Sequence, residues 1–164
     1  MSERNAAAPP GPPQGSGSVA FLLAQVGAHA GARFAERIAP LDLRPQHAGA
    51  LRIVGLSAGL SQRALAERLG VLPSRLVLLV DELEARGLVE RRDDPADRRS
   101  YAVHLTERGR TALRALGAAA REHQEDLLAA LAGPEREQLG ELLRRIAGQQ
   151  GLTPGVHPGF KALR

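Results

Sequence analysis

The sequence predicts a mainly α-helical protein whose row of helices is interrupted once by a β-hairpin. Apolar residues make up 43% of the chain, and most are Leu or Ala, which are strong helix formers. Apolar side chains recur with a helical period through most of the sequence, and the period becomes that of a strand only within residues 88–105. The chain has 164 residues, which is enough for one domain with a substantial core.

We expect that single domain to occupy residues 18–148. Residues 1–17 are rich in Pro, Gly, Ala and Ser, and they have too few large apolar side chains for burial to offset the entropy of ordering. Residues 149–164 contain several Gly and Pro, which interrupt any regular element. The first segment is therefore predicted to be a flexible tail and the last a mostly irregular one.

Apolar periodicity and capping residues predict six helices. Ser18, Ser61 and Thr106 each precede an apolar run as N-cap residues. Gly55 and Gly59 are predicted to break the second helix. The predicted helices span residues 18–39, 45–56, 61–70, 73–86, 106–131 and 135–147.

Between the fourth and fifth helices the sequence predicts a hairpin. Residues 88–92 and 100–105 have the pattern of short strands, and the polar segment 93–99 joins them. A helix, a turn and a second helix followed by a hairpin are the order of a winged helix-turn-helix. Here this unit is flanked by long N-terminal and C-terminal helices.

Composition narrows the classes of function. The chain has no Cys, which excludes disulfides, thiolate metal sites and thiol-based redox sensing. No apolar run approaches the roughly 20 residues of a bilayer crossing, and residues 1–18 lack the apolar core of a signal peptide, so we expect a cytoplasmic protein. The formal net charge of +4 is compatible with a polyanionic partner, and the scarcity of aromatic residues favours duplex over single-stranded nucleic acid.

Residues 60–110 resemble the DNA-binding lobe of the MarR family of winged helix-turn-helix transcriptional regulators. The resemblance depends on several pieces at fixed distances, which are Leu65-Ala66 through Leu69-Gly70, Leu83–Val89, Asp97-Arg98-Arg99, and Leu105-Thr106 with Gly109. It implies a DNA-binding lobe over about residues 45–105 and dimerisation helices over 18–39 and 106–148. In that arrangement the fourth helix enters a major groove about 12 Å wide, and the hairpin tip reaches a neighbouring minor groove.

Candidate DNA contacts lie on the third and fourth helices and on the hairpin. Arg75 lies in the first turn of the fourth helix and is the best candidate base reader, because Arg bonds guanine O6 and N7 together. The resemblance implies that Asp97 orients Arg99 for the minor groove, with Arg98 beside it; the alternative is a solvated turn with a weak surface ion pair. Arg91 is expected to be a phosphate contact or a solvated charge. The candidates are Ser61, Gln62, Arg63, Pro73, Ser74, Arg75, Val77, Leu78, Arg91, Asp97, Arg98 and Arg99.

The fourth helix departs from the family pattern. Leu72 stands where a Ser or Asp cap is usual, and Val77 and Leu78 stand where Ser or Thr and Arg are common. Base hydrogen bonds are therefore not carried over to these two positions. Contact with a thymine methyl is one role for them, and burial in the domain is the expectation for Leu78. Without a side-chain cap, the first N–H groups of this helix are free to meet a phosphate.

The resemblance also implies a homodimer and a small-molecule pocket. In the family the first, fifth and sixth helices entwine two subunits, and the predicted fifth helix of about 39 Å would outreach a monomer of this size. The alternative is that the apolar faces of these helices form an intramolecular core. A two-fold dimer reads a pseudo-palindromic operator. Candidates for binding a small aromatic or phenolic effector, or for ordinary core and surface roles, are His29, Arg33, Phe34, His47 and Arg52.

These features predict a ligand-responsive repressor that binds specific sequences in double-stranded DNA. An architectural or partner-binding winged-helix protein without an effector is one alternative. A metal-responsive regulator is another, although no two of the five His have the spacing of a metal site. No nucleophile elbow, P-loop or paired-glycine fingerprint occurs, so neither an enzyme activity nor a cofactor is expected.

Overall fold

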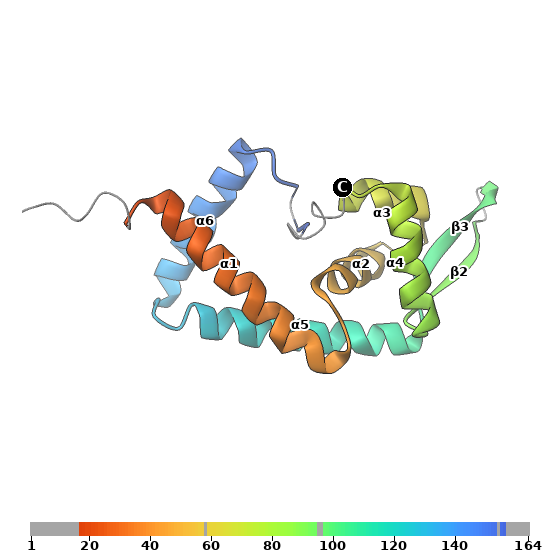
Figure 1. The fold of residues 1–164 in the computed structure, drawn as a ribbon, viewed down its shortest axis with the longest axis horizontal. Helices are drawn as coiled ribbons and strands as arrows, with labels where there is room; N and C mark the ends of the chain where they lie inside the picture. The colour runs from red at the N-terminus through yellow and green to blue at the C-terminus, as the bar shows by residue number, and fades with distance from the viewer. Residues whose placement is uncertain (1–16, 58, 95–96, 154, 157–164) are drawn as a thin grey trace, which may run out of the picture.

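The computed structural model describes residues 17–57, 59–94, 97–153 and 155–156, apart from the side chains of residues 94 and 97–100. This part of the chain forms helices with a small antiparallel sheet that projects at one end of the molecule (Figure 1). The helices are α1 (Val19–Ile38), α2 (Pro45–Leu56), α3 (Gln62–Leu69), α4 (Pro73–Ala85), α5 (Glu107–Leu127) and α6 (Gly133–Gln149), with a short 3₁₀ helix at Ala39–Leu41. The strands are β1 (Leu60–Ser61), β2 (Val89–Asp94) and β3 (Asp97–Leu105).

This order confirms the predicted mainly α winged helix-turn-helix with long terminal helices. The three predicted N-caps are also confirmed, because each hydroxyl accepts a hydrogen bond from a backbone N–H three residues on. Ser18 Oγ lies 3.2 Å from the Phe21 nitrogen, and Thr106 Oγ1 lies 3.0 Å from the Gly109 nitrogen. Ser61 Oγ accepts in the same way at 3.2 Å. These local signals therefore fixed the starts of α1, α3 and α5.

The sheet is larger than the predicted hairpin. Its strand order is β1-β3-β2, and β2 pairs with β3 from Val89 opposite Leu105 outward to the tip. The predicted strands were too short, because most of the polar segment 93–99 continues the ladder instead of forming a loop. β1 was not predicted, since two residues opposite Val103 and Ala102 are too few to show an alternating pattern.

The role of Gly55 and two helix boundaries differ from the prediction. α2 continues through Gly55, because that residue lies against α5, where a Cβ atom would come within 2.4 Å of Leu113 Cδ2. The glycine serves close packing here and does not break the helix. α5 ends at Leu127, four residues earlier than predicted, and α6 begins at Gly133 with Pro134 in its first turn.

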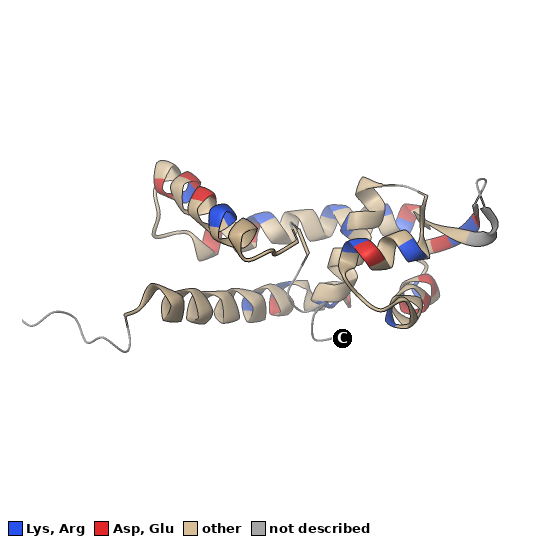
Figure 2. Ribbon diagram, turned by 90° about the horizontal axis from the view of Figure 1, so that it is seen from above, with Lys and Arg blue, Asp and Glu red and all other residues tan. Residues whose placement is uncertain are grey.

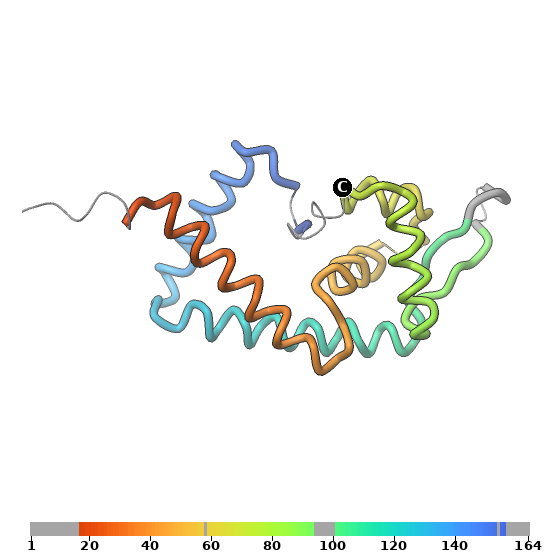
Figure 3. The backbone as a smooth tube through the Cα atoms, in the orientation of Figure 1, coloured from red at the N-terminus to blue at the C-terminus, as the bar shows by residue number. Residues whose placement is uncertain are grey.

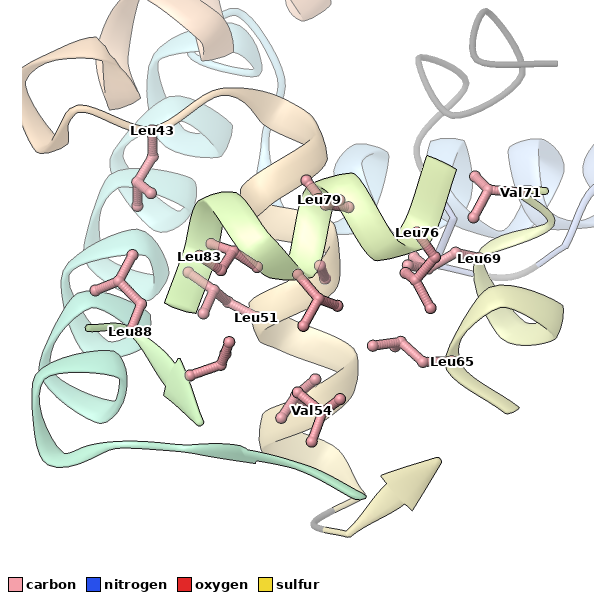
Figure 4. Packing of buried hydrophobic residues seen from close by; sticks show 14 of the residues in the cluster. Leu43, Leu51, Val54, Leu65, Leu69, Val71, Leu76, Leu79, Leu83 and Leu88 are labelled. Carbon is pink, nitrogen blue, oxygen red and sulfur yellow. The ribbon is translucent and has the colours of Figure 1, made fainter. Parts of the chain in front are cut away.

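The core of the winged helix-turn-helix lies where α2, α3 and α4 meet the sheet (Figure 4). Its large side chains are apolar and almost wholly removed from water, with the buried His47 of α2 as the polar exception. Fully burying one such Leu or Val contributes roughly 1.5–3 kcal/mol. The central residues are Leu51 and Val54 of α2, Leu65 and Leu69 of α3, Leu76, Val80 and Leu83 of α4, and Val89 and Val103 of the sheet.

The long helices extend away from this lobe. Figure 3 shows α1 crossing α5, with the start of α1 and all of α6 at the end of the molecule opposite the hairpin. α1 packs on α5 and only lightly on α2. No residue of α6 is buried. The molecule thus consists of a packed winged helix-turn-helix and helical arms whose residues are mostly exposed.

Gly109 is predicted to be intolerant of any side chain, because a Cβ atom there would lie 1.9 Å from the Leu88 carbonyl oxygen. That carbonyl also accepts the Thr106 N–H at 3.2 Å, so the start of α5 is fixed against the end of the helix-turn-helix. Gly109→Ala should lower the free energy of unfolding by about 3 kcal/mol or more. Gly148→Ala, where nothing lies within 4 Å, should instead raise it by about 0.4–1 kcal/mol. Urea unfolding measures both, and equal stability of the two variants would contradict this packing.

Candidate nucleic-acid interface

The turn between α3 and α4 sets the direction of the second helix. Gly70 ends α3 with φ of +64°, a left-handed conformation that favours glycine. Val71 then enters the core, and Pro73 opens α4 at a position where a missing N–H costs nothing. The result is a helix-turn-helix in which α4 is the recognition helix.

One face of α4 is buried and the opposite face is open to solvent. The outward positions include Pro73 and Ser74, which are exposed, and Arg75, which is half-buried. Leu78 is 64% exposed and Val77 is 41% exposed, so the expected burial of Leu78 is wrong. Because the inner face is already filled by Leu and Val side chains, these two residues fall on the far side of the helix.

The N-terminus of α4 has no side-chain cap. Leu72 occupies the cap position and is 53% exposed, and its side chain cannot accept a hydrogen bond. Its carbonyl accepts the N–H groups of Arg75 and Leu76 at 3.0 and 3.1 Å, so the Ser74 N–H is the one left without a partner in this turn among the described residues. The N-terminal end of a helix carries a partial positive charge and unpaired N–H groups. This end of α4 is therefore suited to an anion such as a phosphate.

The three candidates at the start of α3 have different surroundings. The Ser61 hydroxyl is used as the helix cap. The Gln62 side-chain oxygen accepts a hydrogen bond from Arg91 Nη2 at 3.2 Å. Arg63 is 87% exposed and pairs with Glu67 one turn along at 3.1 Å. Such an exposed pair contributes little to stability, so Arg63 is available to another partner.

Arg91 connects the hairpin to the recognition helix. Its guanidinium forms ion pairs with Asp81 and Glu84 of α4, and its backbone N–H donates to Glu84 Oε1 at 3.1 Å. The side chain is only 18% exposed and also reaches Gln62 of α3. Arg91 thus lies inside the protein as a clamp between β2, α3 and α4, whereas Arg92 is exposed and pairs with Glu90.

The wing residues lie further along the same hairpin. Asp97, Arg98 and Arg99 belong to β3, with Asp97 opposite Asp94 at the tip. Their side chains lie outside the described part of the molecule. The backbone alone places the three residues on the projecting end of a strand whose base is fixed by Arg91.

A buried histidine forms a second connection to α4. His47 of α2 is fully buried, and its Nδ1 accepts the Arg44 N–H at 3.1 Å while its Nε2 lies 2.9 Å from Glu82 Oε2. This geometry fits a neutral ring that donates from Nε2 to the carboxylate. Burial lowers the pKa of His47, although the hydrogen bond to Glu82 opposes the shift. The hydrogen bond from His47 and the contact with Arg44 lower the pKa of Glu82.

Acidification is therefore predicted to destabilise the fold through His47. The unfolded chain protonates this ring near pH 6.5, whereas the folded chain does so only at a lower pH. Between these values the unfolded state binds more protons, so stability present above pH 6.5 is lost as the pH falls. Between pH 7.5 and 5.5 the unfolding temperature should fall less in His47→Gln than in the wild type. In the control His104→Gln it should fall as much as in the wild type. An unchanged loss in His47→Gln would contradict this role.

The effector candidates fall into two hollows and the core. A cavity of about 790 Å³ lies between α1, α2 and α5, and it is lined by Phe34 and Arg52 among mainly apolar residues. Arg52 Nη1 donates to the Gly155 carbonyl at 3.1 Å, so the segment after α6 forms part of the wall. His29 and Arg33 line a separate hollow of about 190 Å³. The structure does not bring His47 to either hollow.

Several residues of this region were not predicted. Arg44, Asp81, Glu82 and Glu84 fix α4 to its neighbours, yet in the sequence they look like ordinary surface charges. The only available signal was the cluster of acids at positions 81–84, ahead of a basic strand. Among the described residues, no group of three His, Asp or Glu side chains is placed to hold a metal ion. No helix in the same part of the chain is long and apolar enough to cross a bilayer.

The sequence matches proteins of known class along most of its length. The profile of the MarR family matches residues 41–100. A Thauera aromatica protein described as a transcriptional regulator of the hcr operon is 35% identical over 140 residues, which are 85% of this chain and 84% of that protein. The chain belongs to the MarR family. It is a MarR-family DNA-binding transcriptional regulator and not an enzyme.

Solved MarR-family structures share the fold. The repressor CouR bound to a 23-mer DNA duplex is 32% identical, with a TM-score of 0.71 over 79% of this chain and 92% of that one. CouR from Rhodococcus jostii bound to p-coumaroyl-CoA is 33% identical, with a TM-score of 0.68 over 80% and 93%. The Mycobacterium tuberculosis MarR family protein Rv2887 in complex with salicylic acid is 28% identical, with a TM-score of 0.64 over 79% and 96%.

Proposed function

We propose that this MarR-family chain is a ligand-responsive repressor that binds a pseudo-palindromic operator as a homodimer. The observation that carries the proposal is the open outer face of α4, next to a hairpin whose base is clamped to that helix by Arg91. A rigid helix and a projecting hairpin at a fixed spacing are what two adjacent DNA grooves require. The DNA complex of the relative CouR supports the same use of the fold.

The homodimer follows from apolar surfaces on the helical arms. The first fourteen residues of α1, Val19–Ala32, carry no charged side chain, and Figure 2 shows this stretch as an uncoloured rod. Val19 is 71% exposed and Phe21 is 48% exposed, and α6 exposes Leu142 and Ile146 in the same way. Contiguous apolar surface of this kind marks a protein interface. A second copy with the same faces covers both helices around a two-fold axis.

Base recognition is assigned to the outer face of α4. Arg75 pairs with a guanine through its two parallel N–H donors, with Ser74 beside it at the first turn. Val77 and Leu78 expose methyl groups where hydrogen-bonding side chains are absent, so they fit thymine methyls in the same half-site. The uncapped N-terminus of α4 and the exposed Arg63 contact phosphates, which hold the helix in register.

The wing is assigned to the minor groove. Arg99 enters the groove with Arg98 beside it, and Asp97 orients them, as the likeness to the family implies. Arg91 acts from inside the protein as the support of this wing and not as a phosphate contact. Removal of the wing arginines therefore lowers affinity for related sites together, whereas removal of Arg75 changes which sites are preferred.

Ligand response is assigned to the cavity between α1, α2 and α5. Its volume of about 790 Å³ is within the range of small-molecule sites, and its lining is mainly apolar with Arg52 as a charged group. An aromatic or phenolic acid fits this chemistry, and the salicylic acid and p-coumaroyl-CoA complexes of two relatives support it. Because His47 of α2 hydrogen-bonds to Glu82 of α4 and both helices contribute to the same core, a ligand against α2 can shift the recognition helices relative to the arms.

Selection of bound duplexes from a random pool tests the proposal. The wild-type protein should recover two inverted half-sites about one helical turn, roughly 34–36 Å, apart. Arg75→Ala should lose the guanine preference at one position of each half-site, at a cost of about 1–3 kcal/mol on the selected operator. Arg108→Ala, an exposed arginine on α5, is the matched control and should select the wild-type sequence. Recovery of single, unpaired sites, or an unchanged preference in Arg75→Ala, would contradict the assignment.

A further inference from the structure

A second hollow borders the apolar cavity and has the opposite chemistry. It has a volume of about 690 Å³ and lies between the end of α2, the strands β2 and β3, and α5. We call it the arginine basin. Its charged lining consists of Arg92, His104, Arg110, Arg114 and Arg121, and none of the described lining residues is Asp or Glu.

Three of these arginines form a stripe on one face of α5. Arg110, Arg114 and Arg121 follow at intervals of four and seven residues, which places them on the same side of a helix. Gly117 lies between them on that face, so no side chain fills the middle of the stripe. Like charges four residues apart destabilise an isolated helix by a few tenths of a kcal/mol. A bound anion removes that repulsion.

The arginines differ in how far the protein already neutralises them. Arg110 pairs with Glu107 at 2.8 Å, and Arg92 pairs with Glu90. Arg114 donates to the Thr111 hydroxyl at 2.8 Å, which leaves its charge uncompensated. Among the described residues no carboxylate forms an ion pair with Arg114 or Arg121. The basin therefore retains positive charge along α5.

The arginine basin and the apolar cavity share a border. Gly55, Leu113 and Gly117 line both. At this border the Leu113 side chain packs against Gly55, and Gly117 contributes no side chain to either hollow. A single ligand can therefore place an apolar group on one side and a polyanion on the other.

We infer that the effector is an apolar acyl or aryl group joined to a phosphate-bearing carrier, as in a coenzyme A thioester. The acyl group occupies the apolar cavity, the chain of the carrier crosses the shared border over Leu113 and Gly117, and its phosphates bind the α5 arginines. Arg guanidinium groups match phosphate geometry with paired N–H donors. The inference deepens the proposed function, because it concerns the ligand that acts at the same cavity.

DNA is the other polyanion that such a surface could attract. The lining of the basin comes from α2, β2, β3 and α5, and it includes no residue of the recognition helix. A hollow that opens into an apolar cavity also fits a bipartite small molecule better than a straight sugar-phosphate backbone. DNA contact by these arginines is therefore an outcome that would overturn the inference.

Calorimetric titration of the full chain with benzoate, coenzyme A and benzoyl-CoA tests the inference. We compare the wild type with Arg114→Gln/Arg121→Gln and with a control of equal charge, Arg108→Gln/Arg144→Gln. Benzoyl-CoA should bind the wild type and the control alike and should bind the basin variant at least tenfold more weakly. Binding of coenzyme A should also be weaker in the basin variant, whereas binding of benzoate should be unchanged. Operator affinity without ligand should be equal in all three proteins.

Two sets of results would overturn the inference. One is equal binding of benzoyl-CoA to the wild type and to the basin variant, or no binding of benzoyl-CoA or coenzyme A to the wild type. The other is a loss of operator affinity in the basin variant without ligand, which would assign the arginines to DNA. In either case, release of the operator by benzoate or another free aromatic acid would still support the proposed function as a ligand-responsive repressor.

Discussion

Burial of the inner face of α4 against α2, α3 and the sheet is the constraint on which the DNA-binding lobe depends. Leu76, Val80 and Leu83 are almost wholly removed from water, and each contributes free energy on the order of 1.5–3 kcal/mol. This burial fixes the rotation of the helix about its own axis. Val77 and Leu78 face outward as a consequence, with the half-buried Arg75 beside them, and the proposed base recognition depends on this orientation.

Two polar contacts fix the relative orientation of the elements that pack around this core. The Arg91 clamp ties the hairpin to α4 and α3, and the neutral His47 ring ties α2 to α4 through Glu82. Arg91 is 18% exposed and His47 is fully buried, so loss of the acidic partner leaves a shielded polar group unpaired and costs more than loss of a surface pair. These contacts hold α4, the hairpin and α2 at a fixed mutual geometry, and the proposed ligand response depends on this connection.

The fold could be predicted where local sequence signals determine the structure. It could not be predicted where contacts between residues far apart in the sequence determine it. Caps such as Ser61 act within one turn, so the starts of helices were predictable. Gly55 was misread as a breaker because its neighbour Leu113 is 58 positions away in the chain. The contacts of Arg91 with α4 depend on the register of the strands. The exposure of Leu78 depends on which face of α4 packs against the core. Neither is visible from residue type alone.

The most direct test of the account is hydrogen–deuterium exchange of the full chain with and without its selected operator. The Ser74 N–H in the first turn of α4 has no partner among the described residues, since Pro73 has no N–H and the N–H groups of Arg75 and Leu76 donate to the Leu72 carbonyl. It should exchange fast in the free protein and become protected on DNA, because a phosphate meets it and holds the turn in place. Peptides over Pro73–Leu78 and the hairpin tip should therefore show the largest protection, with α6 unchanged. Protection confined to α1 and α6, with no change over Pro73–Leu78, would show that another surface binds the duplex.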